Sequence, residues 1–176
     1  MQLILNSKTY INNNFDYLMK KLFEVLLPAK ADNDIHGSKT PLYFLVLIAF
    51  IGTIRSFIHM FFPDGGAGSI AGMNIPEISA NEFLFVWALW GSAQLIYALI
   101  QWIVIFRYRS LVPLMWIIQI LESLLRMFVG HIKPVDFANV PPGAYQNYIY
   151  IILAVAMLAL SIGPQNRMKI DILIMQ

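Results

Sequence analysis

The sequence contains no cysteine, few charged residues and no recognisable catalytic motif. The lack of cysteine excludes disulfides, thiolate metal sites, Fe–S clusters and cysteine nucleophiles. No HExxH motif, P-loop or Ser-His-Asp spacing is present, which favours a protein without catalytic activity. The formal net charge is only +2 and the basic residues form no single patch, so nucleic acid is not an expected partner.

Apolar residues, by contrast, are in excess. They make up 59% of the 176 residues and charged residues 12%, against about 45–50% and about 25% in soluble domains. With a mean hydropathy of +0.65, the chain is expected to be an integral membrane protein. Four mostly apolar stretches are each long enough, at ~1.5 Å per residue, to cross a ~30 Å hydrocarbon layer. They are residues 41–62, 82–106, 111–131 and 144–163.

This pattern predicts an all-α, polytopic membrane protein with one domain, a bundle of four transmembrane helices over residues 41–163. Residues 1–40 form an N-terminal arm and residues 164–176 a tail. The first residues are too polar for a secretory signal, so the first span is expected to serve as an uncleaved anchor.

The arm contains an amphipathic segment at residues 15–28. Asn14 can cap a helix there, and Pro28 lies near its end. The segment is too short and too polar to span a membrane, so we expect a helix lying in the cytoplasmic interface. A cap over the cytoplasmic ends of the bundle and a docking site for a partner subunit are the alternatives. The apolar stripe consists of Phe15, Leu18, Met19, Leu22, Phe23 and Leu26.

Four polar residues interrupt the first and third spans: Arg55, His59, Glu122 and Arg126. A charge near the middle of a bilayer costs at least ~2.5–3.5 kcal/mol, so such residues usually face a partner or a wet cavity. Counted along the helices, Arg55 lies between Glu122 and Arg126 in depth, in the outer half of the bundle. We therefore predict an Arg55–Glu122 ion pair between neighbouring spans.

The charges of this group do not balance. Glu122 precedes Arg126 by four residues, the favourable order for a pair within one helix. Two arginines and one carboxylate leave one positive charge, which Asp64, Glu82 or an anionic ligand would match. The group is either a structural ion network, a site for binding or proton handling, or a set of side chains that reach the outer headgroups.

Glutamines and small residues mark faces for helix packing. In the second span Trp87, Gly91, Gln94, Ala98 and Gln101 recur every three or four residues, which predicts a seam with hydrogen bonds between helices. Gln119 lies on the same face of the third span as Glu122. The tryptophans and the group Tyr145, Tyr148 and Tyr150 need no ligand, since several of them lie where interfacial aromatic belts are expected.

His59 and His131 lie at similar outer depth on different spans. Such a pair can ligate a haem, although ordinary hydrogen bonds are the simpler expectation. A metal site of these histidines with Asp64 is a further alternative, but no metal-binding motif supports it, and no metal is predicted. The glycine-rich segment within residues 63–81 is expected to fold over the outer end of the bundle.

A series of short motifs runs along residues 42–163: Asn81-Glu82-Phe83, Trp90-Gly91, a basic break at Arg107 and Arg109, and Leu125-Arg126 followed by Gly130-His131. In order and spacing it resembles the DoxX-like group of small four-span bacterial membrane proteins, and within that group a family without an assigned function. The residues that carry over are Asn81, Glu82, Gly91 and Arg126, while Leu84 and Leu125 stand where that group has arginine and glycine. The resemblance implies a protein of a bacterial inner membrane. Some DoxX-like proteins are membrane subunits of quinone-linked redox systems, so the resemblance also implies a quinone-linked role.

The sequence leaves three functional hypotheses. The first is an accessory or scaffold subunit of a membrane complex, or a homo-oligomer, with the lipid bilayer and other membrane subunits or further copies as partners. The second is a redox-linked membrane subunit that binds quinone, haem or lipid near Arg55, His59, Glu122 and Arg126. The third is a small proton-coupled transporter that uses Glu122.

Basic residues outside the spans predict the orientation in the membrane. Nine lie on one side and only Lys133 on the other, so the positive-inside rule puts both termini in the cytoplasm. Reporter fusions after Gln176 and within residues 63–81 are expected to give cytoplasmic and external signals respectively; the reverse pattern would refute the orientation. The nine are Lys8, Lys20, Lys21, Lys30, Lys39, Arg107, Arg109, Arg167 and Lys169.

Overall fold

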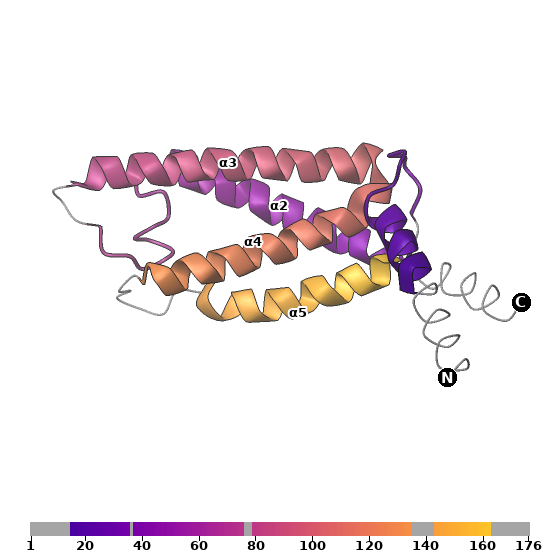
Figure 1. Ribbon diagram of the computed structural model, residues 1–176. Helices are drawn as coiled ribbons and strands as arrows, with labels where there is room; N and C mark the ends of the chain where they lie inside the picture. Colours follow the sequence, from indigo (N-terminus) through magenta and orange to yellow (C-terminus); the bar gives the residue numbers. More distant parts are fainter. Residues whose placement is uncertain (1–14, 36, 76–78, 135–142, 163–176) are drawn as a thin grey trace, which may run out of the picture.

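Helices are the regular elements of the chain wherever its structure is described. The computed structural model describes residues 15–35, 37–75, 79–134 and 143–162, and in the last range the side chains from Asn147 onward. In chain order it has α2 (Thr40–Phe61), α3 (Ala80–Arg107), a 3-10 turn η2 (Arg109–Leu111), α4 (Val112–Ile132) and α5 (Gly143–Ile162) (Figure 1). The all-helical prediction is thus confirmed.

The helices begin and end within two residues of the predicted spans. Prolines in the first turn of α2 and of α4 suit helix starts, where the missing N–H has no helical partner. Helices α2, α3 and the η2–α4 segment are long and apolar enough to cross a membrane. Helix α5 has 20 residues and is apolar as well. These helices indicate an integral membrane protein.

The four helices form two hairpins. Helix α2 packs mainly along α3, and α4 packs mainly along α5, with fewer contacts between the two pairs. The pairs converge at the end where α2 begins and α5 ends, and they spread apart towards the other end (Figure 1). An apolar core occupies the convergent end, with Leu45, Ala49 and Trp116 fully buried. Trp116 is therefore a core residue and not part of an interfacial belt.

Hydrogen bonds hold the segments together at the convergent end. The hydroxyl of Ser110, in the α3–α4 turn, accepts from the backbone N–H of Asp32 (3.0 Å) and donates to its carbonyl (3.1 Å). The backbone N–H of Ser38 donates to the Leu160 carbonyl at the end of α5 (3.0 Å). The segment that precedes α2 therefore connects both hairpins.

The predicted seam between α2 and α3 is present. Gly91 and Ala98 are buried, and Trp102 donates from Nε1 to Thr53 Oγ1 across the helix pair (3.1 Å). A Cβ atom on Gly91 would lie 2.7 Å from His59 Cβ and 3.2 Å from the Ser56 carbonyl oxygen. The backbones approach so closely here that only glycine fits.

Residues 15–26, within the predicted amphipathic segment, are helical and are drawn in indigo near the end of α5 (Figure 1). Only Val25 is buried, whereas Phe15 and Phe23 are 60% and 58% exposed. Of the predicted stripe, Leu22 and Leu26 are half-buried and the other residues are exposed, so most of the stripe does not pack on the bundle. Lipid and a partner subunit both remain candidates to cover the stripe.

The contact at Gly91 predicts a stability difference between two glycines. Gly91→Ala should lower the free energy of unfolding by ~1–2 kcal/mol, because overpacking of ~1–3 kcal/mol exceeds the gain in helix propensity. Gly130, in α4, has open space where a Cβ atom would lie, so Gly130→Ala should be neutral or stabilising. Denaturation in mixed micelles, followed by circular dichroism, measures both; equal stabilities would contradict the close approach.

Candidate functional site

A cavity of about 460 Å³ lies between the two hairpins and is lined by all four helices. It brings together the charged residues of the first and third spans with the three glutamines that were predicted to mediate helix packing. Apolar side chains form the remaining wall. The lining residues are Ile48, Ile51, Gly52, Arg55, Gln94, Tyr97, Ala98, Gln101, Gln119, Glu122, Arg126, Asn147, Ile149, Tyr150 and Leu153.

Arg55 enters the cavity from α2 and is held mainly by groups on its own hairpin. Its Nε donates to His59 Nε2 (3.3 Å), and its guanidinium lies 5.1 Å from the Trp90 ring centroid in a cation–π contact. When the Gln94 amide is oriented with its oxygen towards the neighbouring donors, it accepts from Arg55 Nη2 (3.0 Å) and Trp90 Nε1 (3.2 Å). The other guanidinium N–H groups remain available to the cavity.

His59 is fixed as a neutral imidazole. Arginine has only donors, so Nε2 must accept, and the ring proton is on Nδ1. From there it donates to the Gly65 carbonyl (2.7 Å). Trp87 Nε1 lies 2.9 Å from His59 Nδ1 and 2.8 Å from the same carbonyl; because a protonated Nδ1 cannot accept, its N–H is assigned to the carbonyl. The ring also stacks on Trp90. His59 therefore positions Arg55 and fastens the following loop to α3, but adds no charge.

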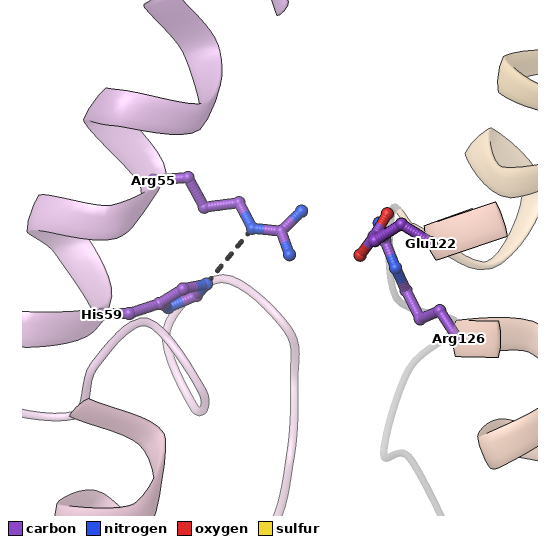
Figure 2. Close-up of polar contacts among 4 residues, drawn as sticks. All are labelled: Arg55, His59, Glu122 and Arg126. Carbon is purple, nitrogen blue, oxygen red and sulfur yellow. Dashed lines mark hydrogen bonds and ion pairs between the residues drawn. The ribbon is translucent and has the colours of Figure 1, made fainter. Parts of the chain in front are cut away.

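The predicted Arg55–Glu122 ion pair is wrong for the described residues. Glu122 instead pairs with Arg126 on its own helix, and the guanidinium of Arg55 points towards this pair from the opposite side (Figure 2). The reason lies in the packing: α2 and α4 belong to different hairpins, so the cavity separates their side chains. The four-residue spacing gives Glu122 a nearer partner.

Neither acidic residue at the rim compensates Arg55 in the described part of the chain. The Asp64 carboxylate accepts from the backbone N–H groups of Ser69 (2.6 Å) and Gly66 (2.9 Å), which lowers its pKa because they stabilise the charged form. It thereby shapes its own loop, in which Gly65 and Gly66 have positive φ. Glu82 is exposed, and the only ion pair among the described residues is Glu122–Arg126.

Several buried polar atoms around the cavity have no partner within the described structure. They include Gln101 Nε2, on a side chain only 1% exposed, and Arg126 Nε. The prediction that glutamines bond across helices thus holds for Gln94 but not for the amide nitrogen of Gln101. Unmet buried donors cost about 1–3 kcal/mol each, which favours an occupant that accepts hydrogen bonds.

Two tyrosines and an asparagine belong to this site although the sequence pattern did not place them there. Tyr97 lies between Gln94 and Gln101 on the inward face of α3, a spacing that could have identified it. Tyr150 and Asn147 are three residues apart on α5, and both reach the cavity. Tyr150 is therefore not a belt residue, in contrast to the exposed Tyr148. The hydroxyls of Tyr97 and Tyr150 also lack partners in the described structure.

The second histidine of the proposed haem pair does not line the cavity. His131 is exposed in the last turn of α4. Both ring nitrogens of His59 already make hydrogen bonds, so iron would have to displace Arg55 from Nε2. In the described ranges no three His, Asp or Glu side chains cluster as metal ligands do.

No protein-family model matches the chain, and no curated protein or solved structure is significantly similar to it. The resemblance to DoxX-like proteins accordingly stays a prediction. The described residues of the site define its chemistry: one ion pair, one arginine without a carboxylate partner, and a surplus of hydrogen-bond donors.

The observed pairing predicts which charges are energetically coupled. In a double-mutant cycle, Glu122→Gln and Arg126→Gln should couple by roughly 1 kcal/mol, because they form one ion pair. Arg55→Gln combined with Glu122→Gln should couple more weakly than that pair, because the two charges face one another across the cavity without forming an ion pair. Unfolding titrations of the purified protein in mixed micelles measure both cycles. Stronger coupling of Glu122 to Arg55 than to Arg126 would show that the cavity closes in solution.

Proposed function

We propose that this chain is a four-span membrane protein, with both termini cytoplasmic, that binds a ligand in the cavity between its hairpins. The observation that carries the proposal is the position of the charges. Arg55, Glu122 and Arg126, the charged residues inside the apolar helices, all line one cavity. Charges in a membrane-length helix are expensive and typically mark a functional pathway or site.

The build of the cavity supports ligand binding. Its volume of about 460 Å³ falls within the ~300–1,000 Å³ range of small-molecule sites. Its wall combines apolar side chains with a few convergent polar groups, as such sites do. A structural ion network would instead be expected to meet its own donors, and here Gln101 Nε2 and Arg126 Nε have no partner in the described structure.

Among the ligands considered from the sequence, lipid and quinone suit the cavity better than haem. Both carry oxygen acceptors that its surplus donors can meet, whereas haem requires an imidazole that Arg55 does not occupy. A proton-coupled role for Glu122 has less support, because its carboxylate is already engaged in an ion pair with Arg126 on the same helix.

Native mass spectrometry tests this function on protein extracted gently from its own membrane. A small-molecule adduct is expected on the wild type, and Leu153→Trp should remove it by filling the cavity. Leu160→Trp is the matched control, because Leu160 is an exposed residue on the same helix and does not line the cavity. A wild type without any adduct, or an adduct equally retained in both variants, would refute the proposal.

An accessory or scaffold subunit, or a homo-oligomer, is the second candidate. It is favoured by the broad apolar surface that the bundle exposes, including Phe85, Leu89 and Ile96 on α3 and the stripe of the helix at residues 15–26. Lipid alone can also cover this surface, so only a bound partner chain distinguishes this role from that of a single ligand-binding chain. Masses of co-purifying chains, or multiples of the 20.1 kDa chain, in the same spectra would support this role.

A further inference from the structure

We infer that the ligand is a single-chain amphiphile with an anionic oxygen headgroup, a carboxylate or a phosphate, bound head-first to Arg55. This inference rests on the proposed function, whose cavity it assigns to a class of ligand. Three properties of the cavity carry it: the sign of its charge, the nature of its unmet hydrogen-bonding groups, and the character of its wall.

The charge of the cavity is positive. Of its described lining residues only Arg55, Glu122 and Arg126 are charged, and Glu122 is matched by Arg126. Arg55 is left with neutral partners: His59 Nε2, the Gln94 amide and the Trp90 ring. A carboxylate or phosphate meets a guanidinium through paired N–H···O bonds, the geometry that neutral partners cannot offer.

The unmet hydrogen-bonding groups are mainly donors. Arg126 Nε and Gln101 Nε2 can only donate, and the hydroxyls of Tyr97 and Tyr150 can donate as well. An occupant rich in acceptor oxygens satisfies all of them, whereas a cationic or donor-rich ligand satisfies none of the first two. The unmet donors therefore favour a headgroup with acceptor oxygens, as the positive charge of the cavity does.

The character of the wall sets the remainder of the ligand. Ile48, Ile51, Ile149 and Leu153 line the cavity beside the polar groups, so part of the occupant must be apolar. The buried core around Leu45 packs the convergent end of the bundle. The cavity, of about 460 Å³, has the size of a small-molecule site, which suits a single-chain amphiphile better than a two-chain phospholipid.

Binding of defined amphiphiles to the full-length protein in a non-ionic detergent tests the inference. Dodecanoate and dodecyl phosphate are compared with methyl dodecanoate, which has no charge, and with acetate and inorganic phosphate, which have no chain. Titrations followed by native mass spectrometry give each Kd. At least one anionic amphiphile is expected to bind ten times or more tightly than the ester and the chainless anions, and the tighter of the two identifies the head.

Variants locate the binding energy. Arg55→Gln should weaken binding of the anionic amphiphile by at least about thirtyfold, which corresponds to ~2 kcal/mol for a charge pair removed from a desolvated site. Arg107→Gln, an exposed arginine at the end of α3, should leave it within about twofold. Glu122→Gln should tighten it, because a negative charge near the head is lost; weaker binding would overturn the assignment.

The outcomes separate this inference from the function on which it rests. Equal binding of ester and dodecanoate to the wild type would refute the anionic head and leave ligand binding in the cavity standing. Equal binding of acetate or phosphate and the chain-bearing anions would refute the amphiphile. If none of these probes binds and the native protein has no adduct, both proposals are refuted.

Discussion

The cost of a charge inside an apolar helix is the constraint on which the arrangement of this bundle depends. A guanidinium or carboxylate in a membrane-length helix needs a partner, a donor network or water, and no lipid tail supplies these. The protein meets the constraint in two ways. Glu122 and Arg126 neutralise each other along α4, while Arg55 is surrounded by the neutral His59, Gln94 and Trp90. The Glu122–Arg126 pair has no net charge, whereas Arg55 keeps a positive charge that faces the cavity.

That cavity exists because the two hairpins pack tightly at one end only. Leu45 and Trp116 fill the convergent end, and the hydrogen bonds between Asp32 and Ser110 hold it. Towards the other end the hairpins diverge, and polar side chains replace the apolar ones between them. The loop after α2 secures this end differently, through the Gly65 carbonyl, which accepts hydrogen bonds from both His59 and Trp87. The packed core and the cavity thereby lie at opposite ends of one bundle.

His59 both positions Arg55 and holds the loop that follows α2. Its Nε2 orients Arg55 towards the cavity, and its Nδ1–H binds the loop carbonyl, so the loop and the arginine are positioned by the same ring. Gly91 makes this possible, because a larger residue would strike the Cβ of His59. The close approach of α2 and α3 is therefore linked to the position of the charge in the site.

The sequence by itself determined the helices and the identity of the polar residues. Length and hydropathy located α2 to α5 within two residues, because an apolar run of this length has few other stable structures, and the cost of buried charge identified Arg55, Glu122 and Arg126 as important. Tertiary structure alone decided the partners. Helical spacing cannot say which helices share a hairpin, so Arg55 was assigned to Glu122 rather than to His59 and Gln94. It also cannot say where a packed bundle opens, which is why Tyr97, Asn147 and Tyr150 belong to the site only through the divergence of the hairpins.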